Sequence, residues 1–239
     1  FNTAFGYAAL TQQTATGSVY NTAIGYNAGA AVTTGIHNTL IGGLCGDALT
    51  TSVYNTAVGY AALSSETAGY SNTAIGYQAL LTQNNTSSTN VYNTAVGRNA
   101  GLSVTTGQRN TFVGGLCGDA TVDSSDNTAI GYLSLSADSG GTCTAVGAGA
   151  LQVTTGYDNT AMGYNAGSAV GSGNNNLLLG HDAGVTGSPG GNVSGTNSNT
   201  IVLGDENIAS ANIQVDWTVA SDERDKTDFV DLDLGLDLV

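Results

Sequence analysis

The sequence predicts an all-β protein, a parallel β-solenoid or β-roll built from stacked coils of about 17 residues. Two observations lead to this fold class. The motif Asn-Thr-Ala-Ile/Val-Gly-Tyr recurs along residues 1–204, and the composition is poor in charged and large apolar side chains. A chain of this kind folds by stacking, because each repeat packs against its neighbours.

The composition limits what the core is made of. Only 9% of residues are charged and 41% are hydrophobic, yet there are just 4 phenylalanines, 1 tryptophan and 1 methionine beside 35 glycines. The core is therefore expected to consist of Ala, Val, Ile, Leu and Tyr. Low charge together with this apolar content argues against a disordered chain.

The spacing of the motif glycines along the sequence gives the length of each coil. Its commonest spacing is the one that separates Gly25 from Gly42, and longer intervals mark insertions such as Gln83–Asn90 and Gly187–Gly195. A second, longer period relates Gly42–Asp47 to Gly114–Asp119, which indicates that four coils were duplicated together. The glycines are Gly6, Gly25, Gly42, Gly59, Gly76, Gly97, Gly114, Gly131, Gly147, Gly163, Gly180 and Gly204.

Each coil is expected to contain one short strand at the motif, since a repeat of this length is too short for a helical hairpin and Asn21–Tyr26 is rich in strand formers. Side chains alternate across a strand, so Ala23 and Ile24 point to opposite faces. One face fills the narrow interior. The other is also apolar and needs a partner, for which identical chains are the simplest source.

The remaining motif positions have structural interpretations. Gly25 and its equivalents suit a sharp turn or a close backbone approach, and Asn21 and its equivalents can form a hydrogen-bonded ladder between coils. The tyrosines after the glycine form a column that we interpret as a packing ladder, although aromatic columns also bind glycans. They are Tyr7, Tyr26, Tyr60, Tyr77, Tyr132 and Tyr164.

The charge distribution excludes one class of partner. The chain has four basic residues, and 10 of its 18 acidic residues lie between Asp205 and Asp237. It therefore lacks the basic surface that nucleic acid requires. No apolar run reaches the roughly 20 residues of a membrane-spanning helix, so membrane insertion is not expected.

Cysteine and histidine give no sign of a metal or cofactor site. Cys45 and Cys117 lie four coils apart, about 19 Å at the usual strand spacing, which is beyond the reach of a disulfide. Cys143 replaces a motif asparagine and has no evident mate. His37 and His181 lack metal-ligand spacing and are expected at surface or ladder positions. We expect no cofactor and no metal.

The repeat resembles two families. It is similar to the head repeats of trimeric autotransporter adhesins and to the related repeats of bacteriophage tail-fibre and tailspike proteins, over about Phe1–Gly204. The resemblance implies a left-handed parallel β-roll assembled as an elongated homotrimer. Adhesin coils are shorter than the coils of this chain, which is the main departure.

The chain divides into residues 1–204, a neck at 205–220 and a terminal segment at 221–239. Ser221–Phe229 resembles the start of the intramolecular chaperone domain of endosialidase-type tailspikes, a self-cleaving peptidase family with the pattern Ser-Asp-x-Arg-x-Lys. That resemblance makes Ser221 the nucleophile, Lys226 its base and Ala220–Ser221 the cleaved bond. Apart from this single-turnover reaction, no enzyme activity is expected.

These features together predict a structural and adhesive segment of a phage tail fibre. Its expected partners are two further copies of itself, other virion tail proteins and a host surface receptor, either a glycan or an outer-membrane component. Receptor contacts are expected at exposed coil edges and insertions such as Gln83–Asn90. The alternatives are a trimeric adhesin on a bacterial surface and the non-catalytic part of a glycan-cleaving tailspike. No paired carboxylates support glycosidase activity.

The terminal motif generates a test in the full-length gene product. Ser221→Ala is expected to abolish cleavage without preventing folding, because it removes only the nucleophile. Lys226→Ala is expected to slow or stop cleavage, and Lys226→Arg does not rescue it, since arginine does not give up its proton. The mass of the fibre chain is the readout, with Ala220 at its new C-terminus. Unchanged processing of the Ser221→Ala protein would refute the assignment.

Overall fold

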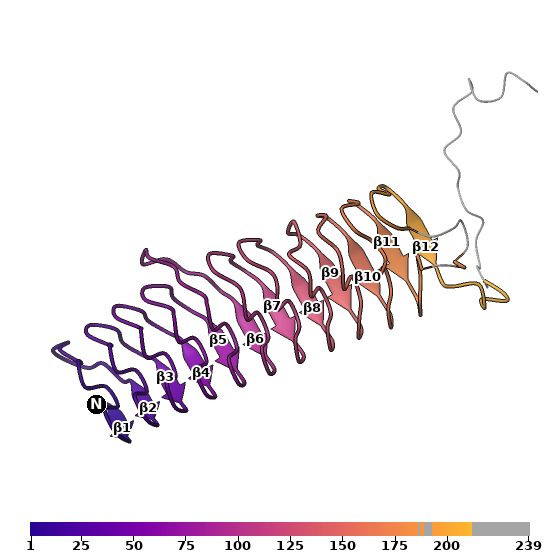
Figure 1. Ribbon diagram of the computed structural model, residues 1–239. Helices are drawn as coiled ribbons and strands as arrows, with labels where there is room; N and C mark the ends of the chain where they lie inside the picture. Colours follow the sequence, from indigo (N-terminus) through magenta and orange to yellow (C-terminus); the bar gives the residue numbers. More distant parts are fainter. Residues whose placement is uncertain (186, 189–192, 212–239) are drawn as a thin grey trace, which may run out of the picture. The chain divides into compact units, whose positions relative to one another are not determined.

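The computed structural model describes residues 1–185, 187, 188 and 193–211. Within these residues the chain forms a stack of coils that contains strands and turns and no helix. Each coil contributes one three-residue strand, and the strands lie side by side along the stack from β1 to β12 (Figure 1). Phe1–Asn207 forms one compact unit.

The strands are β1 (Thr3–Phe5), β2 (Thr22–Ile24), β3 (Thr39–Ile41), β4 (Thr56–Val58), β5 (Thr73–Ile75), β6 (Thr94–Val96), β7 (Thr111–Val113), β8 (Thr128–Ile130), β9 (Thr144–Val146), β10 (Thr160–Met162), β11 (Leu177–Leu179) and β12 (Ile201–Leu203).

All twelve strands form one parallel sheet in sequence order. Neighbouring strands pair without a register shift, so threonine lies beside threonine and alanine beside alanine, as in the pairing of β4 with β5. The register is kept even between β5 and β6, where Thr73 pairs with Thr94 across the insertion. Insertions therefore bulge out of the coils and leave the sheet unchanged. This confirms the predicted parallel β-solenoid.

The motif asparagines form the predicted ladder inside the stack. The Asn38 side chain is buried, and its backbone N–H donates to Oδ1 of Asn21 at 2.8 Å. Its own Nδ2 donates to the Ser52 carbonyl at 2.8 Å, and its Oδ1 accepts from the backbone N–H of Asn55 at 3.0 Å. One asparagine thus satisfies backbone groups of its own coil and of the next one.

The motif glycine is required where consecutive coils come closest. Gly25 has φ +142°, in the region that glycine tolerates, and a Cβ there would collide with the carbonyl oxygen of Gly42 in the next coil. The same collision is repeated along the stack, for example between Gly59 and Gly76. Both sequence-based explanations, a turn and a close approach, are confirmed.

The interior is thin, and side-chain sizes are matched across it. The middle strand residue points inward and is usually a fully buried alanine, such as Ala23. Where Phe112 occupies this place, Gly101 and Gly118 lie against its ring, because a Cβ at either glycine would come within about 3.0 Å of it or closer. Leu40 has the same relation to Gly46. This matching accounts for Gly46 and Gly118, the third glycine in each of the duplicated Gly-Gly-Leu-Cys-Gly-Asp segments.

One coil encloses a buried carboxylate. Glu66 takes an inward position that Val32 and Leu49 hold in the two preceding coils. Its Oε1 accepts hydrogen bonds from the backbone N–H groups of residues 67, 68 and 69. Its Oε2 accepts from Nε2 of Gln83 at 2.8 Å, and Gln83 Oε1 accepts in turn from Asn93 Nδ2 at 2.8 Å. The backbone N–H of Asn85 also donates to Glu66. This network fixes the base of the insertion between β5 and β6.

Between Asn2 and Asn176 the asparagine ladder is interrupted once, at Cys143. The coil before it has 16 residues, and the Cys143 backbone N–H still donates to Oδ1 of Asn127 at 3.0 Å. The thiol lacks the amide that would continue the ladder, and its Sγ lies 3.4 Å from the Gly156 carbonyl oxygen. Nδ2 of Asn127, also buried, has no hydrogen-bond partner. The ladder is locally weaker at this coil.

Restoring the ladder should stabilise the stack. In Cys143→Asn, the new Nδ2 can donate to the Gly156 carbonyl and the new Oδ1 can accept from the Asn159 backbone. We expect the free energy of unfolding to rise by about 1 kcal/mol, the usual net contribution of a hydrogen bond. Equilibrium denaturation in urea measures the change.

The reciprocal substitution is the control. Asn110→Cys removes the Nδ2 bond to Ser124 and the Oδ1 bond from Asn127 in an intact part of the ladder. It should lower stability by roughly 1–3 kcal/mol, since buried polar groups lose their partners. If Cys143→Asn destabilises as much as Asn110→Cys does, the ladder is not what holds adjacent coils in register.

Candidate functional site

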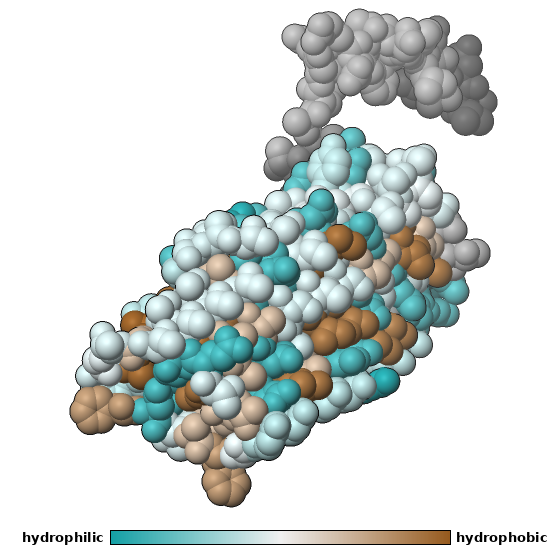
Figure 2. Space-filling model, turned by 60° about the vertical axis from the view of Figure 1, so that its left-hand side comes forward, coloured by the Kyte–Doolittle hydropathy of each residue, from teal (hydrophilic) through white to brown (hydrophobic). Residues whose placement is uncertain are grey.

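The outward side of the sheet forms a continuous surface, here called the outer strand face. It consists of the first and third side chains of each strand, mostly threonine and Ile or Val. Ile24 is 37% exposed and Ile75 is 38% exposed, whereas Ala23 and Ala74, the middle residues of the same two strands, are buried. On the side seen in Figure 2, apolar side chains gather in patches between polar ones. The predicted second apolar face is therefore present and lies at the surface.

A column of side chains follows the C-terminal end of the strands, here called the C-side column. It contains the residue directly after each motif glycine, and the predicted tyrosines belong to it. Tyr7 stacks on Tyr26 with ring centroids 5.5 Å apart, and Tyr60 stacks on Tyr77 at 5.7 Å. Gly43 interrupts the column between these pairs. Tyr164 stacks on His181, whereas Tyr132 lies between Gly115 and Ala148 and stacks on no ring. The column therefore consists of short stacks of tyrosines that are about half exposed or more.

A second column, the N-side column, precedes the strands and was missed by sequence reasoning. It contains the residue directly before each ladder asparagine. Phe1, Tyr20, His37 and Tyr54 stack continuously, with centroids 5.3–5.5 Å apart. Tyr20 and its equivalents have positive φ, +48° for Tyr20 itself, where the chain turns into the strand. The signal was available, because aromatic residues recur one position before Asn21, Asn38 and Asn55.

The stacking geometry bears on glycan binding. Neighbouring rings in both columns are inclined by only 9–25°. Their faces are therefore turned toward each other, and their edges and hydroxyl groups face solvent. Sugar rings pack on aromatic faces, so the stacked rings of both columns are a poor platform for them. The arrangement favours the packing-ladder interpretation of the tyrosines.

The N-side column changes character along the stack. Arg109 and Asp126 occupy consecutive positions and form an exposed ion pair with Nε and Oδ1 2.6 Å apart. The hydrogen bond from Arg109 lowers the pKa of Asp126 below its ordinary value. Further along, Asp158, Asn175 and Asn199 line a shallow groove of about 400 Å³ together with side chains of β10, β11 and β12. The N-side column is thus polar at its C-terminal end, whereas the outer strand face there carries Leu177 and Ile201 in place of threonine.

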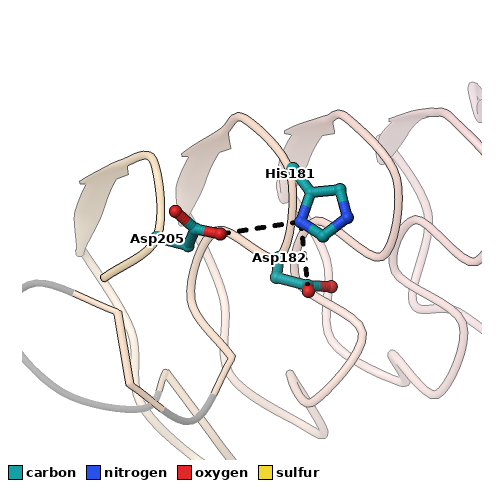
Figure 3. A group of neighbouring side chains, drawn as sticks. All are labelled: His181, Asp182 and Asp205. Atoms are coloured by element: carbon teal, nitrogen blue, oxygen red, sulfur yellow. Dashed lines mark ion pairs between the residues drawn. The ribbon is translucent and has the colours of Figure 1, made fainter. Parts of the chain in front are cut away.

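Three potential metal ligands meet in the last coils of the C-side column. His181 follows Gly180, Asp182 is its neighbour, and Asp205 follows Gly204 in the next coil (Figure 3). His181 Nδ1 lies 3.1 Å from Asp182 Oδ2 and 3.6 Å from Asp205 Oδ2. The Asp205 side chain is only 11% exposed. Sequence reasoning missed this cluster, because Asp205 reaches His181 across an insertion that lengthens the interval between coils.

The cysteines are buried in the interior. All three are free, in agreement with the predicted absence of a bridge between Cys45 and Cys117. Burial raises the pKa of Cys45 to about 12 and that of Cys117 to about 11. Their thiols donate to the carbonyl oxygens of Ala57 and Ala129 at 2.9 and 3.0 Å. Such thiols are poor nucleophiles and serve as packing groups.

The predicted cleavage site lies outside the described residues. Ser221, Lys226 and the Ala220–Ser221 bond all fall within 212–239, so their roles remain predictions. In the described part of the neck, the backbone N–H of Asn207 donates to Asp205 Oδ1 at 2.9 Å and its Nδ2 donates to Asp205 Oδ2 at 3.1 Å.

The described part contains no helix with the length and apolarity that a membrane crossing needs. No protein-family model, curated protein or solved structure matches the chain.

Proposed function

We propose that this chain is a structural and adhesive segment of a bacteriophage tail fibre, assembled side by side with identical copies. The observation that carries the proposal is the outer strand face, an apolar surface that follows the whole stack. Isolated exposed apolar side chains are ordinary, but a contiguous row marks an interaction surface. Here the row repeats from β2 to β12.

The periodicity of that face favours identical partners. Its side chains repeat once per coil, at the spacing of about 4.8 Å between paired strands. Only a surface with the same period can match it along its full length. A second copy of the chain has the same period, because it has the same sequence. The number of copies, three, and the left-handed sense of the coils come from the family resemblance in the repeats.

Such an assembly suits an extended fibre outside the cell. Each coil is fixed to its neighbours by the asparagine ladder and backbone hydrogen bonds, so length can be added coil by coil. We propose that the other partners are virion tail proteins and a host surface receptor. In this function the Ser221 and Lys226 pair releases the terminal chaperone after assembly, which makes the fibre kinetically stable.

Receptor contacts are proposed on the exposed tip of the insertion between β5 and β6. We restrict the proposed contact to the tip of the segment Gln83–Asn90, because Gln83 and Asn85 are buried against Glu66. Thr86, Ser87 and Ser88 are exposed. A deletion that tests adhesion should therefore be restricted to the tip, since removing Gln83 and Asn85 would take away the donors to Oε2 of the buried Glu66 carboxylate.

Association through the outer strand face is tested with Ile75→Lys. The wild-type chain is expected to sediment as a trimer at micromolar concentration. The lysine would place an unpaired charge in an apolar contact, which costs several kcal/mol, so the variant should be largely monomeric. Because Ile75 points away from the interior, its circular dichroism should remain that of the wild type. Analytical ultracentrifugation gives the oligomeric state.

Ser87→Lys is the matched control. It adds the same charge at the exposed insertion tip and should leave the trimer intact. A wild-type chain that is a stable monomer at micromolar concentration would contradict the proposal. So would an Ile75→Lys protein that is as trimeric as the control.

A further inference from the structure

We propose that His181, Asp182 and Asp205 bind one divalent transition-metal ion, with zinc as the best-suited ion, and that this ion fastens the coil of β12 to the coil of β11. The proposal concerns residues of a single chain. It is independent of how many copies assemble.

The distances fit such an ion. Zinc binds imidazole nitrogen and carboxylate oxygen at about 2.0–2.2 Å, so two neighbouring ligand atoms lie roughly 3.0–3.6 Å apart. His181 Nδ1 lies 3.1 Å from Asp182 Oδ2 and 3.6 Å from Asp205 Oδ2. All three ligand atoms lie within 4.8 Å of one another. Small side-chain rotations would complete the site.

The repeat itself supplies an independent argument. The segments Gly25–Gly29 and Gly163–Gly167 both read Gly-Tyr-Asn-Ala-Gly, whereas Gly180–Gly184 reads Gly-His-Asp-Ala-Gly. Both changes replace a side chain that does not ligate zinc well with one that does. Asp205 makes a third such change, because it follows the next motif glycine, where tyrosine is the commonest residue. The three changes meet at one point.

The ligands are held in place by their surroundings. The His181 ring stacks on Tyr164 with centroids 5.2 Å apart, as a tyrosine would in this column. The Asp205 carboxylate accepts hydrogen bonds from the backbone N–H of Asn207 at 2.9 Å and from its Nδ2 at 3.1 Å. Ordered outer partners of this kind orient metal ligands.

The donor set also selects the class of ion. Imidazole suits zinc, copper, nickel and iron, whereas calcium and magnesium prefer oxygen ligands alone. Three protein ligands leave at least one coordination position to water or to an external ligand. An ion that bridges β11 and β12 would hold together the two coils that are joined by the longest segment, because the interval from Leu177 to Ile201 is the longest between paired strands in the stack.

The competing explanation is an ion pair without metal, in which a protonated His181 is held by the two carboxylates. Zinc titration of the whole chain by calorimetry, after removal of metal with a chelator, separates the two. We expect one zinc per chain with a dissociation constant in the micromolar range or below. Calcium at the same concentration should bind far more weakly, and equal binding of calcium would refute the transition-metal assignment.

The decisive variant is His181→Tyr/Asp182→Asn, which recreates the Gly-Tyr-Asn-Ala-Gly sequence found twice elsewhere in the stack. It is therefore expected to fold. Zinc binding should weaken by at least about a hundredfold, since altering outer partners alone weakens metal sites by tenfold or more. His37→Tyr is the matched control. It makes the same change in a stacked histidine that lies between Tyr20 and Tyr54, and zinc binding should be unchanged.

Hydrogen exchange gives a second readout. Zinc should slow exchange of the backbone amides of residues 201–207 in the wild-type chain and in His37→Tyr, and have no such effect in the double variant. The acidic residues beyond 207 are the same in all three proteins. Any zinc that they bind therefore contributes equally to each protein and does not affect the comparison. The proposal is overturned if the wild-type chain binds no zinc at micromolar concentration, or if the double variant binds zinc as tightly.

Discussion

The asparagine ladder is the interaction on which the rest of the structure depends. The ladder asparagines accept a hydrogen bond from the backbone of the next coil, and most of them also donate one to a backbone carbonyl, as Asn38 does with Asn55 and Ser52. These buried amides fix the position at which every coil re-enters the sheet. The strands therefore pair without a register shift, although the intervals between them vary from 16 to 24 residues.

Constant register converts a repeated sequence into columns. Because each coil re-enters at the same place, alanines stack inside the sheet and Ile or Val side chains stack on its outer face. The residues that flank the strand become the N-side and C-side columns in the same way. One side chain of one short coil offers little area for an interaction. A column of equivalent side chains forms a surface that a partner can contact. The proposed assembly surface and the proposed metal site are both positions in these columns.

Sequence reasoning predicted the parts of the fold that repeat, because every coil supplied the same evidence. The strand, the alternation of Ala23 and Ile24 across it, the ladder asparagine and the close approach at Gly25 were all predicted from the motif, and the structure confirms them and places the alanine inward. What it missed depends on single coils. Glu66 becomes a buried hydrogen-bond centre only because Gln83 and Asn85 meet it from the next coil. His181 and Asp205 likewise meet across a 24-residue interval that no sequence period reveals. The cleavage residues Ser221 and Lys226 rest on the resemblance alone.

The most direct measurement of the central claim is hydrogen exchange at the ladder asparagines, resolved residue by residue. The backbone N–H groups of Asn38, Asn55 and Asn72 donate to buried side-chain oxygens, so they should exchange as slowly as amides within the strands. The Asn159 amide faces the Cys143 sulfur, a weaker acceptor, and should exchange faster. If the ladder amides exchange as fast as those of the exposed insertion tip at Thr86–Ser88, the ladder does not hold the coils together.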